Sequence, residues 1–294
     1  MRATAASGRL GVLAAATLFS TGGAVIKAID LTGWQVASLR SGLAALTLLV
    51  LMPESRRGFS RRALAVGVAY AATLVLFVQA NKLTTAASAI FLQSTAPLYV
   101  LLLAPWLLRE RVRRSDLALM AALAVGMACF FLGLDRASAT APRPLLGNVL
   151  AAAAGLTWAL TVMGLRALGR EGGSGAAAGA ALAGNAITAL ACLPLALPLA
   201  GADTGDWAGV AFLGVVQVGL AYLFLTRALT RVPAFEASLL LLLEPVLNPV
   251  WAWLAHGERP GAWSLAGGAL ILAATAAKTA LDARRPPPPD PAAI

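Results

Sequence analysis

The sequence has little of what marks a soluble, secreted or catalytic protein. Its 294 residues include two cysteines, Cys129 and Cys192, and one histidine, His256. Both cysteines lie inside apolar runs rather than in loops, so we expect neither a disulfide framework nor a zinc site. Charged residues make up 12% of the chain, where an ordinary soluble domain has about 25%. A soluble fold could not bury the apolar surface of a chain with so few charged residues.

Signatures of nucleotide binding and catalysis are missing as well. The chain has no GxxxxGK[ST] loop, which argues against an intrinsic ATP-driven pump. HExxH and GxSxG do not occur, and a single histidine cannot form the clustered His and Asp of a membrane enzyme. We therefore predict a protein that is not an enzyme and that has no cofactor and no metal site.

Long apolar runs are what the chain has instead. Hydrophobic residues make up 59% of it, and the mean hydropathy is +0.79. A helix needs about 20 residues to cross a hydrocarbon core of about 30 Å. Between charged, Pro and Gly breaks we predict ten membrane-spanning helices, near residues 8–29, 33–52, 62–82, 85–107, 115–133, 144–168, 175–200, 207–230, 233–255 and 261–281. The predicted fold class is an all-α integral membrane protein with ten transmembrane helices.

The charge distribution predicts how these helices are oriented. The formal net charge is +10, but the basic residues form short clusters between apolar runs, so we expect lipid headgroups and not nucleic acid as their partner. With a cytoplasmic N-terminus, seventeen of the 23 Lys and Arg fall on the cytoplasmic side. The positive-inside rule then puts both termini in the cytoplasm. We expect the protein to lie in the inner, cytoplasmic membrane. Residues 282–294, with four successive prolines, are predicted to form a disordered cytoplasmic tail.

The sequence also repeats itself. A shift of 148 residues places TAPLYVLLLAPWLLRERV on LEPVLNPVWAWLAHGERP and aligns Pro97 with Pro245. We predict two five-helix repeats, residues 1–138 and 139–281. Because each repeat has an odd number of spans, the two must face opposite ways across the bilayer. Inverted repeats of this kind recur in secondary transporters, where they give alternating access to a central site.

Through these paired stretches, each with a mid-helix proline before an apolar run that ends in Glu-Arg, the chain resembles the ten-helix EamA branch of the drug/metabolite transporter superfamily. Phe19 and Trp158, which a shift of 139 residues aligns, place an aromatic residue in the first helix of each repeat. Lys27 and Arg40 sit where the family often has basic residues. The resemblance covers nearly the whole chain. It implies efflux or uptake of a small metabolite, commonly an amino acid, without ATP hydrolysis.

The two aligned prolines are the first candidate site residues. Pro97 and Pro245 each lie about twelve residues into a span, which places them near the bilayer midplane at a rise of about 1.5 Å per residue. Each proline removes a helix hydrogen bond there. Corresponding breaks in two halves mark the binding site or hinge of many transporters, whereas the alternative is a kink that only shapes packing.

Two charged residues are predicted inside the membrane. Glu244, directly before Pro245, is an acidic side chain near the midplane, where it costs about 2.5 to 3.5 kcal/mol on the insertion scale. It is a candidate to bind a cation or a substrate ammonium, to carry a coupling proton or to pair with Arg40; the alternative is a neutral carboxyl that only packs. Arg40 could receive a substrate carboxylate bidentately, or form a structural salt bridge.

Further polar and aromatic residues are predicted at similar depth. Together with the prolines they outline a mildly polar cavity, although each alone could serve as helix glue. The candidate substrate-binding residues, including those above, are Phe19, Ser20, Arg40, Gln93, Pro97, Tyr99, Trp158, Gln217, Glu244 and Asn248. Small-xxx-small spacings such as Gly175 to Gly179 fit close helix packing and equally the face of a homodimer.

Three residues near the ends of spans favour a structural reading. Glu110 and Glu258 end the fourth and ninth predicted helices, and each is followed by an arginine with which it can anchor a turn. His256, beside Glu258, is expected to be an exposed loop histidine rather than a proton relay.

These features predict a secondary transporter for a small metabolite. An amino acid or related compound, exported by alternating access at a midplane site, is the leading hypothesis. An exporter of another class, such as a nucleoside, a vitamin or an organic cation, is the nearest alternative. A non-transporting membrane scaffold or receptor-like homologue is the other, and binding without flux would identify it.

Overall fold

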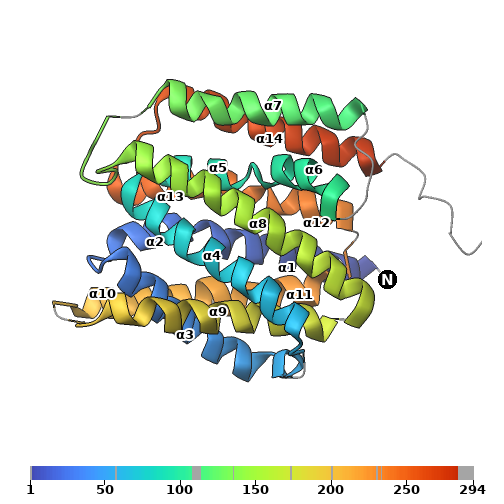
Figure 1. Ribbon diagram of the computed structural model, residues 1–294, viewed down its shortest axis with the longest axis horizontal. Helices are drawn as coiled ribbons and strands as arrows, with labels where there is room; N and C mark the ends of the chain where they lie inside the picture. The colour runs from blue at the N-terminus through green and yellow to red at the C-terminus, as the bar shows by residue number, and fades with distance from the viewer. Residues whose placement is uncertain are drawn as a thin grey trace, which may run out of the picture.

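The computed structural model describes residues 2–56, 58–107, 114–134, 136–172, 174–199, 201–229, 231–232 and 234–283. Within these residues the chain is helical apart from its loops and one isolated bridge between Ser138 and Ala141 (Figure 1). The helices are α1 (Arg2–Ser20), α2 (Gly22–Ala28), α3 (Gly33–Leu51), η1 (Pro53–Arg56), α4 (Arg61–Leu83), α5 (Ala86–Gln93), α6 (Ala96–Leu107), α7 (Arg114–Leu132), α8 (Pro144–Gly172), α9 (Ser174–Ala196), α10 (Thr204–Ala211), the π-helix η2 (Phe212–Leu220), α11 (Ala221–Leu229), α12 (Ala234–Leu241), α13 (Leu243–His256) and α14 (Ala262–Ala283).

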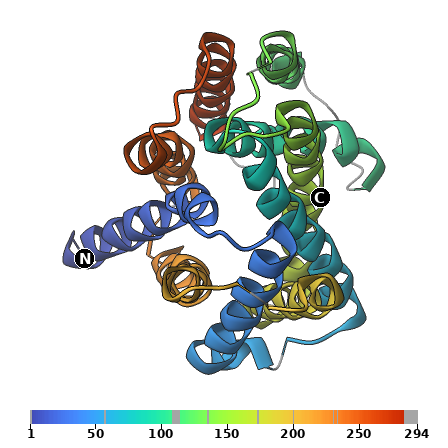
Figure 2. The ribbon, with the colours of Figure 1, turned by 90° about the vertical axis from the view of Figure 1, so that its left-hand side faces the viewer.

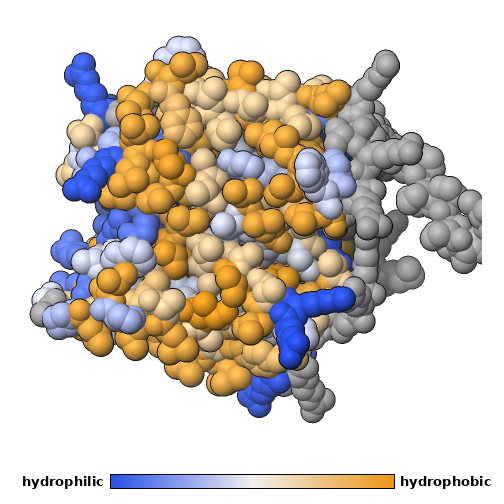
Figure 3. All heavy atoms as spheres, in the orientation of Figure 1, coloured by the Kyte–Doolittle hydropathy of each residue, from blue (hydrophilic) through white to orange (hydrophobic). Residues whose placement is uncertain are grey.

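The helices confirm an all-α membrane fold. Nine of the described segments are long and apolar enough to cross a bilayer, several of them made of two helices in line, and Asp116–Leu132 is a shorter apolar helix. Their bounds lie within a few residues of the ten predicted runs. The predicted tail, residues 282–294, falls almost entirely outside the described residues. Large apolar side chains face outward, among them Leu46, Val50 and Trp106, and an apolar surface covers most of the face drawn in Figure 3.

The long helices run side by side in one bundle. Viewed along the helices, α7 and α14 lie together at one edge of the bundle and α3 and α9 at the opposite edge (Figure 2). The N-terminus and the end of α14 lie at the same face of the bundle (Figure 1), which we call the termini face. The opposite face, where α2, α4 and α13 end, is called the distal face.

Three spans are interrupted near their middle. The breaks lie at Thr21 between α1 and α2, at Ser94 and Thr95 between α5 and α6, and at Leu242 between α12 and α13. Pro97 and Pro245 occupy the first turn of α6 and of α13, where a missing N–H is tolerated. The two prolines therefore mark the breaks that their alignment predicted, whereas the break at Thr21 has no proline.

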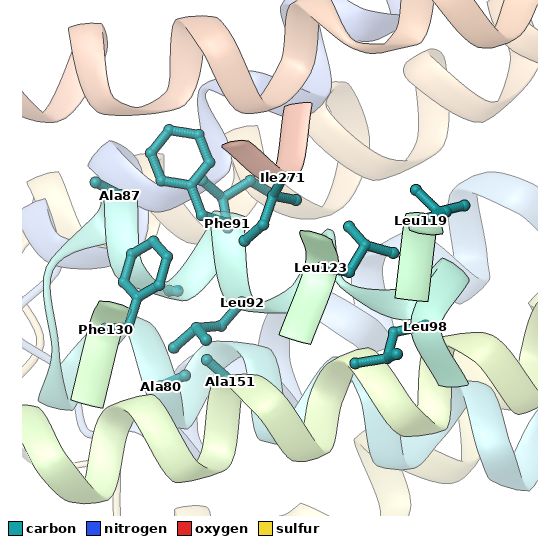
Figure 4. Close-up of a cluster of buried hydrophobic side chains, with 12 residues drawn as sticks. Ala80, Ala87, Phe91, Leu92, Leu98, Leu119, Leu123, Phe130, Ala151 and Ile271 are labelled. Carbon is teal, nitrogen blue, oxygen red and sulfur yellow. The ribbon is translucent and has the colours of Figure 1, made fainter. Parts of the chain in front are cut away.

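Close helix crossings surround the break in the fourth span. A Cβ atom on Gly155 of α8 would meet the carbonyl oxygens of Leu92 and Gln93 at 3.0 and 3.2 Å, so α8 passes directly against this break. A buried apolar cluster holds the same region (Figure 4): Phe91 and Leu92 of α5 pack with Phe130 of α7 and Ile271 of α14. The Phe91 and Phe130 rings have their centroids 6.1 Å apart. Packing thus keeps the broken span in place although its backbone ladder is incomplete.

Candidate functional site

A cavity of about 450 Å³ lies in the middle of the bundle, between the broken spans. Most of the residues selected from the sequence line it: Phe19, Arg40, Gln93, Pro97, Trp158, Gln217, Glu244 and Pro245. Its wall extends to Leu225 and Ser238, which lie within two turns of the ends of α11 and α12 at the termini face. A wider depression of about 820 Å³ at the termini face is lined by mostly exposed residues such as Phe59 and Arg61, and we assign no role to it.

Three selected residues lie outside this cavity. Ser20 is fully buried and accepts a hydrogen bond from the Trp251 indole N–H at 2.8 Å, so it ties α1 to α13. The Tyr99 hydroxyl contacts the Met127 sulfur at 3.6 Å, on the side of α6 that faces α7. Asn248 is buried against Gly23, one turn beyond Glu244 toward the distal face. The sequence predicted their depth, but helix rotation turns them away from the cavity.

Residues at the helix breaks line the cavity wall. A proline cannot donate to the carbonyl four residues before it, which here belongs to Gln93 for Pro97 and to Leu241 for Pro245. Both Gln93 and Leu241 line the cavity. Non-helical backbone at membrane depth is tolerated where it lines a cavity. The corresponding breaks in the two halves thus meet at one place, which is the arrangement that marks substrate sites in transporters.

Four aromatic rings form a continuous wall. Phe19 packs edge-on against Tyr222 with centroids 5.5 Å apart, Tyr222 contacts Tyr70 at 6.2 Å, and Tyr70 contacts Trp158 at 6.1 Å. The two tyrosines were missed from the sequence. A signal for them exists: GVAY ends at Tyr70 in α4, and GLAY ends at Tyr222 in α11. A search for short repeats in the third and eighth predicted spans would have found both.

The cavity holds one basic and one acidic side chain. Arg40, on α3, is 3% exposed; its Nε has no hydrogen-bond partner among the described residues, and its charge lies close to Tyr70 and Tyr222. Glu244, in the first turn of α13, lines the same cavity. In the described part of the chain no ion pair joins Arg40 to Glu244. A basic and an acidic side chain therefore line one cavity without forming an ion pair with each other.

The π-helix η2 brings Gln217 to the cavity and to the break in the first span. Its amide N–H donates to the carbonyl of Phe19 at 3.2 Å, a group that the break at Thr21 leaves without a regular helical donor. A Cβ atom on Gly22 would lie 2.8 Å from the Gln217 amide nitrogen, so a larger residue there would push this amide away from its position. π-Helical turns occur often at functional sites, where they redirect a side chain.

Two predictions were wrong for residues at the distal face, Glu258 and His256. Glu258 does not anchor an exposed turn with Arg259, because its carboxylate is buried and pairs with Lys27 at 3.1 Å. His256 is not an exposed loop residue either. It is the last residue of α13, and its Nε2 lies 2.8 Å from the carbonyl oxygen of Ala24. In both cases the side chain contacts a residue that is distant in the sequence, Lys27 for Glu258 and Ala24 for His256. Glu110, the aligned residue of the first half, lies outside the described residues.

The fold defines a multi-pass membrane protein with a cavity in the middle of its helix bundle. Residues 6–133 and 145–277 each match the model of the EamA-like transporter family. The chain therefore belongs to this family, and its partners are a lipid bilayer and a small-molecule substrate, as predicted from the sequence.

The chain is also similar to two curated proteins and to a solved structure. The pseudopaline exporter CntI of Pseudomonas aeruginosa, in strains UCBPP-PA14 and PAO1, is 28% identical over 275 residues, which cover 90% of this chain and 93% of each relative. A protein of known crystal structure has the same fold, with a TM-score of 0.61 at 24% identity over 95% of this chain and 99% of its own.

Proposed function

We propose that this protein exports a small zwitterionic metabolite, an amino acid or a related compound, from the cytoplasm by alternating access at the central cavity. The observation that carries the proposal is the coincidence of Arg40 and Glu244 with the two proline breaks around one cavity. Arg40 would receive a carboxylate through its planar guanidinium fork, and Glu244 would receive an ammonium group. The aromatic wall of Phe19, Tyr222, Tyr70 and Trp158 would contact the rest of the substrate.

The direction of transport is proposed from the relatives. Both are named as exporters of pseudopaline. Their identity of 28% extends over nearly the whole chain, so we infer the same direction of transport for this protein.

The proposed topology has ten spans, with α7 as the shorter fifth span. The two halves, residues 1–138 and 139–281, would form an inverted repeat in the cytoplasmic membrane, with the termini face in the cytoplasm. In Figure 1, α1 runs from the termini face to the distal face, while α8 runs the opposite way. The excess of basic residues on the termini face supports this orientation.

Pro97 and Pro245 would act as hinges between the half-helices of the fourth and ninth spans. A break without a regular backbone hydrogen bond bends at lower cost than an intact helix. Because the two breaks correspond, they would let each half change its tilt around the same cavity.

Flux in proteoliposomes of the purified protein tests the proposal. The screen uses radiolabelled amino acids, nucleosides, organic cations and pseudopaline, with and without an imposed proton gradient, and protein-free liposomes as the control. We expect saturable flux of a zwitterionic carboxylate that unlabelled amino acids compete for. Flux of nucleosides or organic cations alone would show that the proposed class, zwitterionic carboxylates, is wrong. Saturable binding without flux would identify a receptor-like protein.

A further inference from the structure

A buried ion pair closes the distal face. The Lys27 ammonium, near the end of α2, lies 3.1 Å from the Glu258 carboxylate, two residues beyond the end of α13, and the two side chains are 3% and 4% exposed. Moving charges out of water is costly unless each charge finds a partner and its remaining donors or acceptors are satisfied. The surroundings of both charges therefore decide what this pair does.

Both charges have further partners from other segments. The Lys27 ammonium donates to the carbonyl oxygen of Thr84 at 2.7 Å and to that of Thr140. The other Glu258 oxygen accepts the backbone N–H of Ala86, at the start of α5, at 2.7 Å. One ion pair thus joins four distal segments: the end of α2, the turn between α4 and α5, the loop before α8 and the end of α13. These segments come from both halves of the chain.

The local sequence directs Glu258 into this position. Gly257 ends α13 with a left-handed backbone (φ 64°), which turns the chain so that the next residue points back toward the bundle. His256 adds a contact between α13 and α2 through the Ala24 carbonyl. Lys82 donates to the carbonyl of Ile29 and holds the segment that follows α2.

A strip of α13 connects the cavity with this ion pair. Glu244 lines the cavity, and Asn248, Ala252 and His256 follow at intervals of four residues, which places them on one face of the helix. Asn248 is 1% exposed, and neither of its amide atoms has a hydrogen-bond partner among the described residues. The route from the cavity to the distal face along α13 therefore carries an unsatisfied polar group and ends at Lys27 and Glu258.

We propose that the Lys27–Glu258 ion pair is the distal gate of the transport route, and that it separates in each cycle to release the substrate. The proposal rests on the proposed function. In the closed arrangement both charges are buried, paired with each other and hydrogen-bonded to the backbone of neighbouring segments. When the distal segments part, water hydrates both charges, so opening does not leave either of them buried and unpaired. The closed and the fully open gate are therefore both stable, whereas a half-open gate would leave one charge buried without its partner.

Accessibility of a cysteine behind the gate tests the proposal without any substrate. In a Cys129→Ala/Cys192→Ala background, Ala252→Cys places a reporter on the strip between Asn248 and His256. The full chain in lipid nanodiscs exposes both faces to a water-soluble maleimide, so the result does not depend on orientation or on the compound transported. We expect slow labelling of this reporter in the parent and a rate about tenfold higher or more after Glu258→Gln.

Two matched controls separate gate opening from general loosening. Asp116→Asn removes the carboxylate of another poorly exposed ion pair, with Lys278, between α7 and α14, and should leave the labelling rate unchanged. A reporter at Ala183→Cys, buried where α9 packs on Gly67 of α4, should stay unlabelled in the Glu258→Gln variant. No rise at position 252, an equal rise at 183, or an equal rise after Asp116→Asn would overturn the proposal.

A double variant distinguishes opening of the gate from misfolding caused by an unpaired buried charge. Glu258→Gln leaves Lys27 buried without its counter-charge, whereas Lys27→Met/Glu258→Gln leaves no unpaired charge at the gate. We expect the double variant to be labelled at the same rate as the Glu258→Gln and Lys27→Met single variants, because all three remove the same interaction. Labelling of the double variant at the parent rate would overturn the gate. The absence of flux in the liposome screen would instead count against the proposed function and leave the labelling result intact.

Discussion

Tyr70 and Tyr222 face each other in the cavity wall, with ring centroids 6.2 Å apart and ring planes at 64°. They end the matching tetrapeptides GVAY and GLAY of the two halves. Their outer neighbours match too, since Phe19 contacts Tyr222 and its aligned residue Trp158 contacts Tyr70. The aromatic wall is therefore symmetric about the tyrosine pair, and the proposed substrate lies against the junction of the halves.

The tyrosine pair should affect substrate affinity symmetrically. Tyr70→Ala and Tyr222→Ala each remove two ring contacts, and aromatic pairs are worth about 0.5–1.5 kcal/mol each beyond their buried area. We expect each variant to raise the KM for transport by about tenfold, with Phe replacements much closer to the parent. Concentration-dependent flux in proteoliposomes measures this. If only one tyrosine mattered, the symmetric description of the site would be wrong.

Glu244→Gln should reduce transport at least about tenfold while membrane insertion stays intact, because the amide keeps the shape of the side chain but cannot hold an ammonium group or a proton. Initial rates of flux, normalised to the amount of folded protein, provide the measurement. Glu236→Gln is the matched control: this residue lies earlier in the same span and pairs with Arg9 toward the termini face. Parent-level flux in Glu244→Gln would remove this carboxyl from the mechanism.

Arg40→Ala should weaken transport of carboxylate-bearing substrates more than that of neutral or cationic ones. Charge-assisted hydrogen bonds to a carboxylate contribute about 1.5–3 kcal/mol, which corresponds to an affinity loss of about tenfold to a hundredfold. Arg40→Lys keeps the charge but lacks the planar fork, so its affinity for carboxylate substrates should lie between that of the parent and that of Arg40→Ala. Competition of unlabelled compounds from each class against the transported label compares them. An equal loss for all classes would show that Arg40 is structural.

The prolines should control the rate of transport more than binding. Pro97→Ala and Pro245→Ala restore the N–H that a continuous helix needs and so favour a stiffer span. We expect the maximal flux to fall several-fold, about threefold or more, with substrate affinity nearly unchanged. Pro194→Ala, in the unbroken helix α9, is the comparison variant. A loss of affinity with unchanged maximal flux would instead place the prolines in the binding surface and not in a hinge.

Gly23 should tolerate no side chain. A Cβ atom there would lie 2.6 Å from the Asn248 amide oxygen and 3.0 Å from the Ala86 Cβ, so Gly23→Ala should destabilise the fold by about 1–3 kcal/mol through overpacking. Gly42→Ala is the control, because its added Cβ would meet only the Ala189 Cβ, at an ordinary 3.7 Å. That variant should be unchanged or gain up to about 1 kcal/mol from helix propensity. Thermal unfolding of the purified variants in detergent compares them, and equal melting temperatures would contradict the packing described here.

The sequence by itself determined the positions of the spans and of two helix breaks. Bilayer thickness sets the length of an apolar run, and a run is visible without any tertiary contact. The breaks at Pro97 and Pro245 follow from an N–H that proline lacks wherever it is placed. Depth along a span could also be counted, so most of the residues chosen by depth line the cavity.

Only the tertiary structure decided which residues at that depth meet. Ser20, Tyr99 and Asn248 are rotated toward neighbouring helices, because each helix has just one face toward the cavity. The break at Thr21 depends on Gln217 from η2, which a local pattern does not contain. In the same way, Lys27 and Glu258 lie far apart in the chain, and burial among four segments makes them partners. Interactions within a helix are local and readable, whereas these pairings exist only once the helices pack.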